Sequence, residues 1–216
     1  MKILAFADIH ASDWAIGALA NQIKKHKPDL AINVGDFSIF EEGLETTLDK
    51  LDMLGVPIIT IHGNHETDAI VEYVCRKSKN LMYMHESAKE IDGITFIAWG
   101  GGGFSKVEPM FEDFAKSIKN LKKPAVLITH APIYKTKADK LHSGEHVGCK
   151  SFRSFVEKHK EIVLALSGHI HDSFYTQDKV NNTIVINPGP TGTIIEIKNG
   201  KVSCKFEKLK DMPDMY

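Results

Sequence analysis

The chain has 216 residues, of which 43% are hydrophobic and 25% are charged, a balance typical of an ordinary globular domain. Its formal net charge of −1 argues against a strong nucleic-acid footprint and against binding to an anionic membrane. No apolar run approaches the roughly 20 residues that a membrane-spanning helix needs. We therefore expect no membrane partner.

The cysteines and the first residues of the chain indicate a reducing compartment. The three cysteines are scattered and form neither a disulfide framework nor a CxxC metal pair. Residues 1–7 are mostly apolar, but this run is too short for a signal peptide and Asp8 follows at once. We expect a cytoplasmic protein with one domain over residues 1–209 and a loose tail over residues 210–216.

The first part of the chain alternates short apolar runs with amphipathic segments. Strands are expected over residues 3–7, 30–34 and 57–61, and helices over residues 12–27, 42–54 and 67–77. Ser12 or Asp13 can cap the first helix, and Pro28 stops it. Repeated strand–helix units predict a parallel sheet with functional sites at the carboxyl ends of the strands.

In the middle of the chain, the alternation of strands and helices gives way to short strands. Short strands are expected over residues 81–84, 90–91 and 94–99, with Asp92-Gly93 as a hairpin turn. Four glycines follow at residues 100–103. We interpret them as a tightly packed segment that passes beneath the expected functional site. The alternative, a phosphate-binding loop, lacks the lysine and the spacing of a P-loop.

The second part ends in strands alone. Elements are expected as a helix over 112–122, a strand over 125–129, a helix over 152–159, and strands over 162–166, 174–177, 183–186, 193–197 and 202–206. The polar segment 133–150 contains His142 and His146 and reads as a long loop. Such loops are often functional, so it is expected either to form one wall of a substrate pocket or to be an exposed loop.

Polar side chains directly follow five of these strands. They are Asp8 with His10, Asp36, Asn64 with His65, His130, and His169 with His171. Taken singly, a histidine after a strand is usually a structural residue, and an aspartate there is often a helix cap. Because parallel strands bring their carboxyl ends to one edge of a sheet, five such segments together predict one shared site.

The number and type of these groups predict two metal ions. A catalytic zinc uses three protein ligands and a water, so these donors are too many for one such ion. They suit two ions that share a carboxylate at a separation of about 3.5–4 Å. Mixed nitrogen and oxygen donors favour Mn, Fe, Zn, Ni or Co over calcium. We expect two divalent cations, with manganese first among them.

The ordered motifs resemble those of the calcineurin-like metallophosphoesterase superfamily. The motifs are Asp8-x-His10, Gly35-Asp36, Gly63-Asn64-His65-Glu66, His130 and Gly168-His169-x-His171. Asn187-Pro188-Gly189 also resembles a motif common there, although Pro190 stands where a serine is frequent. The resemblance implies an α/β protein of the four-layer α/β/β/α sandwich type, with two mixed sheets.

The resemblance also implies roles for single residues. Asp8, His10 and His171 would hold the first metal, and Asn64, His130 and His169 the second, with Asp36 bridging both. His65 would act as general acid at the leaving-group oxygen, oriented by Glu66 or by a backbone carbonyl. A metal-bridging hydroxide would attack a phosphate mono- or diester.

Three alternatives within the superfamily differ in substrate. Protein serine/threonine phosphatases usually carry an arginine shortly after the bridging aspartate, whereas residues 37–43 contain none and include two acids. DNA-repair nucleases generally add a capping domain. A small phosphodiesterase or phosphatase acting on a small-molecule or nucleotide phosphoester remains, with the phosphodiesterase favoured and His142 and His146 as weak substrate contacts.

A further alternative is a non-catalytic metal-binding interaction module of the same fold. Such a module is expected to lack ligands. Here every ligand position implied by the resemblance is filled, and so is the position of His65.

Overall fold

The structure, a computed structural model, describes residues 1–206. The expected loose tail at 210–216 and the expected domain end at residue 209 lie outside these residues. Between residues 1 and 206, no helix is long and apolar enough to cross a membrane.

The first part of the chain forms the expected strand–helix units. The elements are β1 (Lys2–Phe6), α1 (Asp13–His26), β2 (Leu30–Asn33), α2 (Leu44–Asp52), β3 (Ile58–Thr60), α3 (Asp68–Lys77) and β4 (Leu81–Tyr83). Ser12 caps α1 by accepting a hydrogen bond from the Ala15 N–H. Lys27 ends α1 in the left-handed conformation, directly before Pro28.

The second part follows the expected order with shifted boundaries. The elements are β5 (Ser87–Ile91), β6 (Ile94–Trp99), α4 (Pro109–Ser117), β7 (Ala125–Thr129), the short 3-10 helix η1 (Lys137–Asp139), α5 (Lys150–Lys158), β8 (Ile162–Leu166), the 3-10 helix η2 (His171–Ser173), β9 (Thr176–Val180), β10 (Thr183–Asn187), β11 (Thr193–Lys198) and β12 (Lys201–Phe206). The largest shift is in α4, which was expected over 112–122. It begins at Pro109, whose fixed φ suits the first turn of a helix.

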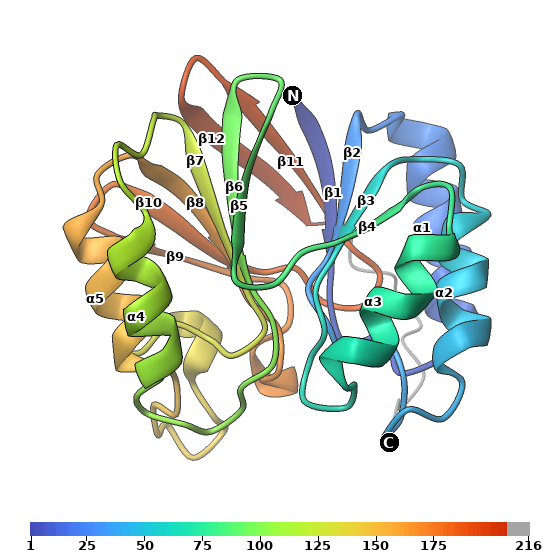
Figure 1. Cartoon of the computed structure of the whole chain (residues 1–216), viewed down its shortest axis with the longest axis horizontal. Helices are drawn as coiled ribbons and strands as arrows, with labels where there is room; N and C mark the ends of the chain where they lie inside the picture. Colours follow the sequence, from blue (N-terminus) through green and yellow to red (C-terminus); the bar gives the residue numbers. More distant parts are fainter. Residues whose placement is uncertain (207–216) are drawn as a thin grey trace.

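Within residues 1–206, the strands form two six-stranded mixed sheets, packed face to face (Figure 1). The first has the order β12-β11-β1-β2-β3-β4 and the second the order β5-β6-β7-β8-β10-β9. Neighbouring strands from β1 to β4 are parallel, as are those from β6 through β7 and β8 to β10. The antiparallel strands β11 and β12 complete the first sheet, whereas β5 and β9 flank the second.

Three apolar clusters separate four layers, which confirms the expected α/β/β/α sandwich. The central cluster packs the two sheets together and includes Ile32, Phe96 and Leu164, each with 5% or less of its surface exposed. A second cluster lies between the first sheet and α1, α2 and α3, and a third between the second sheet and α4 and α5. The helices are seen on the two outer sides in Figure 1. The central apolar cluster therefore fixes how the carboxyl ends of the two sheets meet.

Candidate metal centre

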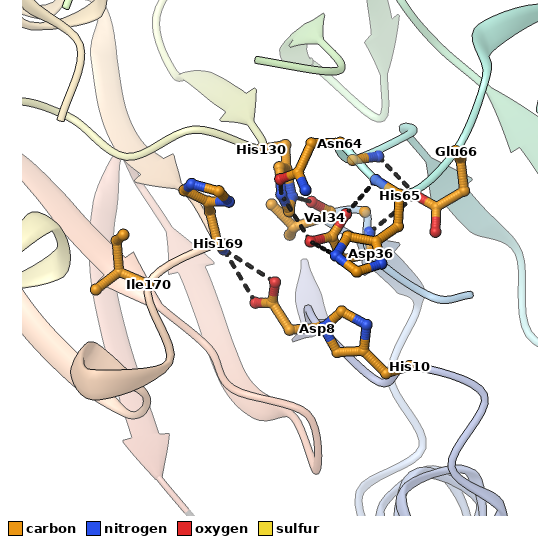
Figure 2. A network of polar contacts seen from close by, with 12 residues as sticks. Asp8, His10, Val34, Asp36, Asn64, His65, Glu66, His130, His169 and Ile170 are labelled. Atoms are coloured by element: carbon orange, nitrogen blue, oxygen red, sulfur yellow. Dashed lines mark hydrogen bonds and ion pairs between the residues drawn. The ribbon is translucent and has the colours of Figure 1, made fainter. Parts of the chain in front are cut away.

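The seven expected ligands come together where the carboxyl ends of β1, β2, β3, β7 and β8 meet. Figure 2 shows those other than His171. They fall into two groups. Ligand atoms of Asp8, His10 and His171 lie within 4.8 Å of one another, and so do those of Asp36, His130 and His169. The same two groups are implied by the resemblance, apart from Asn64, which contacts the second group through its amide oxygen.

The backbone at several of these residues adopts an unusual conformation. The φ angles of Asp8, His10, Asp36 and His169 are 57°, 42°, 52° and 69°. Non-glycine residues rarely adopt positive φ, and such conformations cluster at functional sites. They are held here by bonds between the loops, because the Asp8 and His10 N–H groups donate to the carbonyls of Gly35 and Asp36 at 3.0 and 3.1 Å.

Two motif glycines allow these loops to approach the carboxylates. A Cβ at Gly63 would overlap the Asp36 carboxylate, and one at Gly168 would lie 2.6 Å from Asp8 Oδ2. Gly63 does not have positive φ. Its contribution is therefore space beside Asp36 rather than an unusual turn.

The first group is oriented by backbone atoms. The Ser38 carbonyl can only accept, so His10 Nδ1 donates to it at 3.1 Å and carries the hydrogen. His10 Nε2 then faces His171 Nε2 at 3.3 Å. The His169 N–H donates to both Asp8 carboxylate oxygens at 2.9 and 3.1 Å. These bonds hold the Asp8 carboxylate beside the two imidazoles.

The second group is built in the same way. His130 Nδ1 donates to the Val34 carbonyl at 2.9 Å, which turns Nε2 toward two oxygen atoms. Nε2 lies 3.2 Å from Asp36 Oδ2 and 3.0 Å from Asn64 Oδ1. Asp36 Oδ1 accepts from the His65 N–H at 3.0 Å. Both Asp36 and His130 are buried.

The charges in the two groups differ. Burial raises the pKa of Asp8 to about 7. Burial also opposes the charge on Asp36, but the nearby charge of His130 and its hydrogen bond hold the pKa of Asp36 well below its usual range. Burial disfavours the charged form of His130 too, yet the Asp36 charge raises the pKa of His130 to about 9. Asp36 and His130 thus form a buried ion pair.

Two other imidazoles are neutral. Burial lowers the pKa of His10 and of His169 to about 4 in each case. His169 Nε2 is buried and has no hydrogen-bond partner within residues 1–206. A buried polar atom without a partner requires an explanation.

The donor set fits divalent cations. His169 Nε2 belongs to a group of carboxylate and imidazole donors that point to one place, and a cation there would give it a partner. In the second group, the proton of His130 supplies positive charge between oxygen atoms, where a cation would supply it instead. Neutral imidazoles and ionised carboxylates are the ligand forms that metals require.

His65 lies at the margin of the centre. The Phe40 N–H donates to His65 Nδ1 at 3.2 Å, so the neutral ring carries its hydrogen on Nε2. Nε2 lies 3.9 Å from Asp36 Oδ2, and the ring makes an edge contact with the His10 ring at 4.8 Å between centroids. The half-buried ring stacks on the Phe40 ring. The Nε2 hydrogen is thus on the side of the ring that faces Asp36.

Glu66 does not make the contact that was expected of it. Its carboxylate accepts from the N–H groups of Gly63, Asp36 and Ser38 at 2.8, 3.0 and 2.9 Å, and from the Ser38 hydroxyl at 2.8 Å. These donors engage both carboxylate oxygens. The expectation that Glu66 or a backbone carbonyl orients His65 is therefore wrong: the Phe40 N–H does so, and Glu66 joins the two loops.

The two histidines expected as substrate contacts, His142 and His146, pair with acids. His142 Nδ1 lies 2.5 Å from Asp172 Oδ1, directly after His171 in the chain. His146 Nδ1 lies 2.6 Å from Oδ1 of the buried Asp139. Asp139 also accepts from three backbone N–H groups of the loop. His146 thus helps to fold the loop, whereas His142 lies at the rim of the centre and is highly exposed.

The glycine-rich segment is a tight passage, as expected. A Cβ at Gly101 would lie 2.8 Å from His62 Nε2. The Gly101 N–H donates to the His62 carbonyl at 2.8 Å and the Gly100 N–H to His85 Nδ1 at 2.9 Å. These two N–H groups are already engaged, which argues against the phosphate-loop alternative.

The sequence reasoning missed the atoms that orient the imidazoles. These are the carbonyls of Val34 and Ser38 and the Phe40 N–H. Backbone atoms carry no residue signature, so no motif could have identified them. It also missed Phe104, whose ring contacts His169 edge-on at 4.6 Å.

Comparison with known proteins gives a family match and several relatives. The family model described as calcineurin-like phosphoesterase matches residues 1–173. An uncharacterized protein of Methanocaldococcus jannaschii is 31% identical over 205 residues, which covers 88% of each chain. A probable cyclic nucleotide phosphodiesterase of Synechococcus sp. is 26% identical over 169 residues, 73% of this chain and 63% of that protein.

A solved structure shows the same fold. A crystal structure of a Thermus thermophilus protein superposes with a TM-score of 0.74 at 14% identity. The match covers 95% of this chain and 98% of that one.

Proposed function

The chain belongs to the calcineurin-like phosphoesterase family, and we propose that it hydrolyses a phosphate mono- or diester at a centre of two divalent cations. The observation that carries this proposal is the pair of adjoining ligand groups with Asp36 between them. Asp36 Oδ2 lies 3.2 Å from His130 Nε2 of the second group, and the Asp36 backbone carbonyl accepts from the His10 N–H of the first group at 3.1 Å. A carboxylate in that position suits a bridging ligand.

Each ligand would keep the role implied by the family. Asp8, His10 and His171 would hold one cation, and Asn64, His130 and His169 the other, with Asp36 shared. When bound, two such cations neutralise phosphoryl charge and lower the pKa of water, which supplies a nucleophile. We propose manganese, with Fe, Zn, Ni or Co as alternatives, because the donors mix imidazole nitrogen with oxygen.

We propose that His65 acts at the leaving-group oxygen through its Nε2 hydrogen. The Phe40 N–H occupies Nδ1, so the neutral ring keeps this hydrogen without rearrangement. To act as a general acid, His65 would need a second proton on Nδ1. The Phe40 N–H already points at this atom and opposes the addition of that proton. A hydrogen bond from neutral His65 to the oxygen that gains charge is therefore the narrower proposal.

Diesters are favoured over monoesters. In support, the Synechococcus relative is named a probable cyclic nucleotide phosphodiesterase, although it is only 26% identical. The two acids Glu41 and Glu42 lie on the loop that contacts His65, a charge that disfavours long polyanions such as nucleic acid strands.

The test is hydrolysis of bis(p-nitrophenyl) phosphate against p-nitrophenyl phosphate with added manganese, with bound metal measured in parallel. We expect two ions per chain and faster turnover of the diester. Faster turnover of the monoester would reverse the diester preference. Tight metal uptake without turnover on a broad ester panel would favour the non-catalytic module, and cleavage of single-stranded or duplex DNA in preference to small esters would favour a nuclease.

A further inference from the structure

Exposed aromatic side chains lie beside the centre. Eight large hydrophobic side chains are exposed among residues 1–206, and five of them lie on the segments that follow β2 and β6. The five are Ile39, Phe40, Phe104, Val107 and Met110. Single exposed apolar residues are ordinary, so their contacts decide whether they mark a binding site. The two phenylalanines directly contact histidines of the centre.

Phe40 is fixed in an exposed position. Its side chain is 75% exposed, and its ring stacks on the His65 ring at 4.2 Å between centroids and 25° between planes. Its φ is 48° and that of Glu41 is 69°, a conformation that is an outlier for a bulky residue. The Phe40 N–H bond to His65 Nδ1 helps to hold this conformation. Strain of this kind is typical of residues that contact a ligand.

Phe104 has a matching position beside His169 of the second ligand group. Its side chain is 63% exposed, and its ring meets the His169 ring edge-on at 4.6 Å. The preceding residue, Gly103, lies close enough that an added Cβ would be 3.9 Å from His169 Nε2. The segment after β6 therefore passes beside the second group and leaves the Phe104 ring largely uncovered.

The two rings border the centre from different sides. Figure 2 shows His65 and His169 apart from each other, with Asp36 and His130 between them in this view. Phe40 lies against the first of these histidines and Phe104 against the second. The ester groups of a phosphoryl group bound at the centre can extend in two directions. An aromatic ring would lie beside each of these directions.

We propose that Phe40 and Phe104 bind the organic groups of the substrate, and that the substrate is a small phosphoester bearing a flat aromatic ring of the nucleobase type. This inference rests on the proposed function and adds the substrate class. Phe40, beside His65, would contact the leaving group, and Phe104 the group that stays on phosphorus. Flat rings stack on aromatic side chains with little dependence on sequence or ring substituents.

A binding comparison tests the rings without turnover. AMP and ribose 5-phosphate carry the same phosphate, but only AMP carries a base, so their dissociation constants from the manganese-loaded protein isolate the contribution of the base. We expect AMP to bind roughly 5- to 150-fold more tightly, the range of base–aromatic stacking. AMP has one organic group, which can lie against only one of the two rings, so Phe40→Leu or Phe104→Leu should reduce this ratio, and both variants should change the ribose 5-phosphate constant less than about twofold.

A matched control is available at Tyr73. This aromatic residue is 57% exposed on α3, and Tyr73→Leu should leave the AMP to ribose 5-phosphate ratio unchanged. Both phenylalanine variants keep the backbone, including the N–H that bonds His65. A wild-type ratio near one, or a ratio that both phenylalanine variants leave unchanged, would overturn the proposal.

Kinetics separates this proposal from the proposed function. Bis(p-nitrophenyl) phosphate and methyl p-nitrophenyl phosphate share a leaving group and differ in the group that stays. Phe104→Leu should raise KM for the first several-fold more than for the second, with kcat nearly unchanged. Equal changes in both KM values, in a protein that hydrolyses both esters, would remove the role of Phe104 and leave the hydrolase intact. Absence of all hydrolysis would refute the proposed function, and the binding ratio would still decide whether the rings bind a base.

Discussion

The two sheets contribute different chemistry to the same centre. Loops of the first sheet supply the oxygen donors, Asp8, Asp36 and Asn64, together with a single candidate ligand imidazole, His10. Loops of the second sheet supply imidazoles alone, from His130, His169 and His171. Each ligand group therefore takes its carboxylate from one sheet and at least one imidazole from the other.

Bonds across the sheets support this division of donors. His130 of the second sheet donates to the Val34 carbonyl of the first, and the His169 N–H donates to the Asp8 carboxylate. Asp36 and His130 pair across the same boundary at 3.2 Å. The geometry of the centre is thus set by the packing of one sheet on the other, and neither sheet supplies a complete ligand group.

Removing the shared oxygen donor should have the largest effect. Asp36→Asn replaces the proposed bridging carboxylate by a neutral amide that binds cations weakly. We expect turnover of bis(p-nitrophenyl) phosphate to fall to the uncatalysed background and bound metal to fall below two ions per chain. Full metal-dependent activity in the purified variant would show that Asp36 is not the bridge.

The His65 side chain tests a role of the first sheet that is separate from metal binding. His65→Asn should keep the metal content and lower kcat by about 10²–10³-fold, the effect of removing one donor to a developing oxyanion. The loss should be greatest for esters with poor leaving groups, as measured across a series of substituted aryl esters. Equal losses across that series would count against action at the leaving-group oxygen.

Two histidines of the second sheet should differ in their effect on stability. His130→Ala breaks a pair whose side chains are 0% and 3% exposed and should cost the metal-free protein about 3–5 kcal/mol of unfolding free energy. The His171 side chain is 35% exposed, and His171→Ala should cost roughly 1 kcal/mol. Urea unfolding of both variants measures the difference, and equal losses would contradict the contrast.

Glu66→Gln should weaken the centre without removing a ligand. The amide group of glutamine would turn a donor toward backbone N–H groups that now face a carboxylate oxygen. Since residues that orient ligands affect metal affinity by about 10–100-fold, we expect a loss of that size, measured by metal titration. Unchanged affinity with reduced thermal stability would make Glu66 purely structural.

His142→Ala should have the smallest effect. Its ion pair with Asp172 is exposed, and exposed pairs contribute about 0.2–1 kcal/mol. We expect kcat/KM for small diesters to change by less than about threefold. A loss above tenfold, with stability unchanged, would restore His142 as a substrate contact.

The sequence predicted the layers well because strands and helices differ in apolar period. The runs before Asp8, Asp36, Asn64, His130 and His169 were each expected as strands, and each is one. Boundaries were less accurate where propensity was weak. The helix α4 begins at Pro109 rather than at residue 112, because the fixed φ of proline suits the first turn of a helix.

Within the site, residue types were predictable and their orientation was not. Positive φ at Asp8 and Asp36 has no signature in the sequence, since glycine would be the usual indicator. Glu66 was expected beside His65, but its carboxylate accepts from the backbone N–H of Asp36, 30 residues earlier. Contacts of this kind depend on how the loops pack, which local patterns do not encode.

The pairing of β1 with β11 affects how the chain folds. Residues 2–5 pair with residues 193–196, so one interior strand of the first sheet gains its second neighbour late in synthesis. Until then, a nascent chain has a strand edge at β1 that can pair with other chains. The first sheet cannot be completed before β11 has been synthesised. Because this pairing joins residues that are distant in sequence, folding should be slow relative to helical proteins of this size.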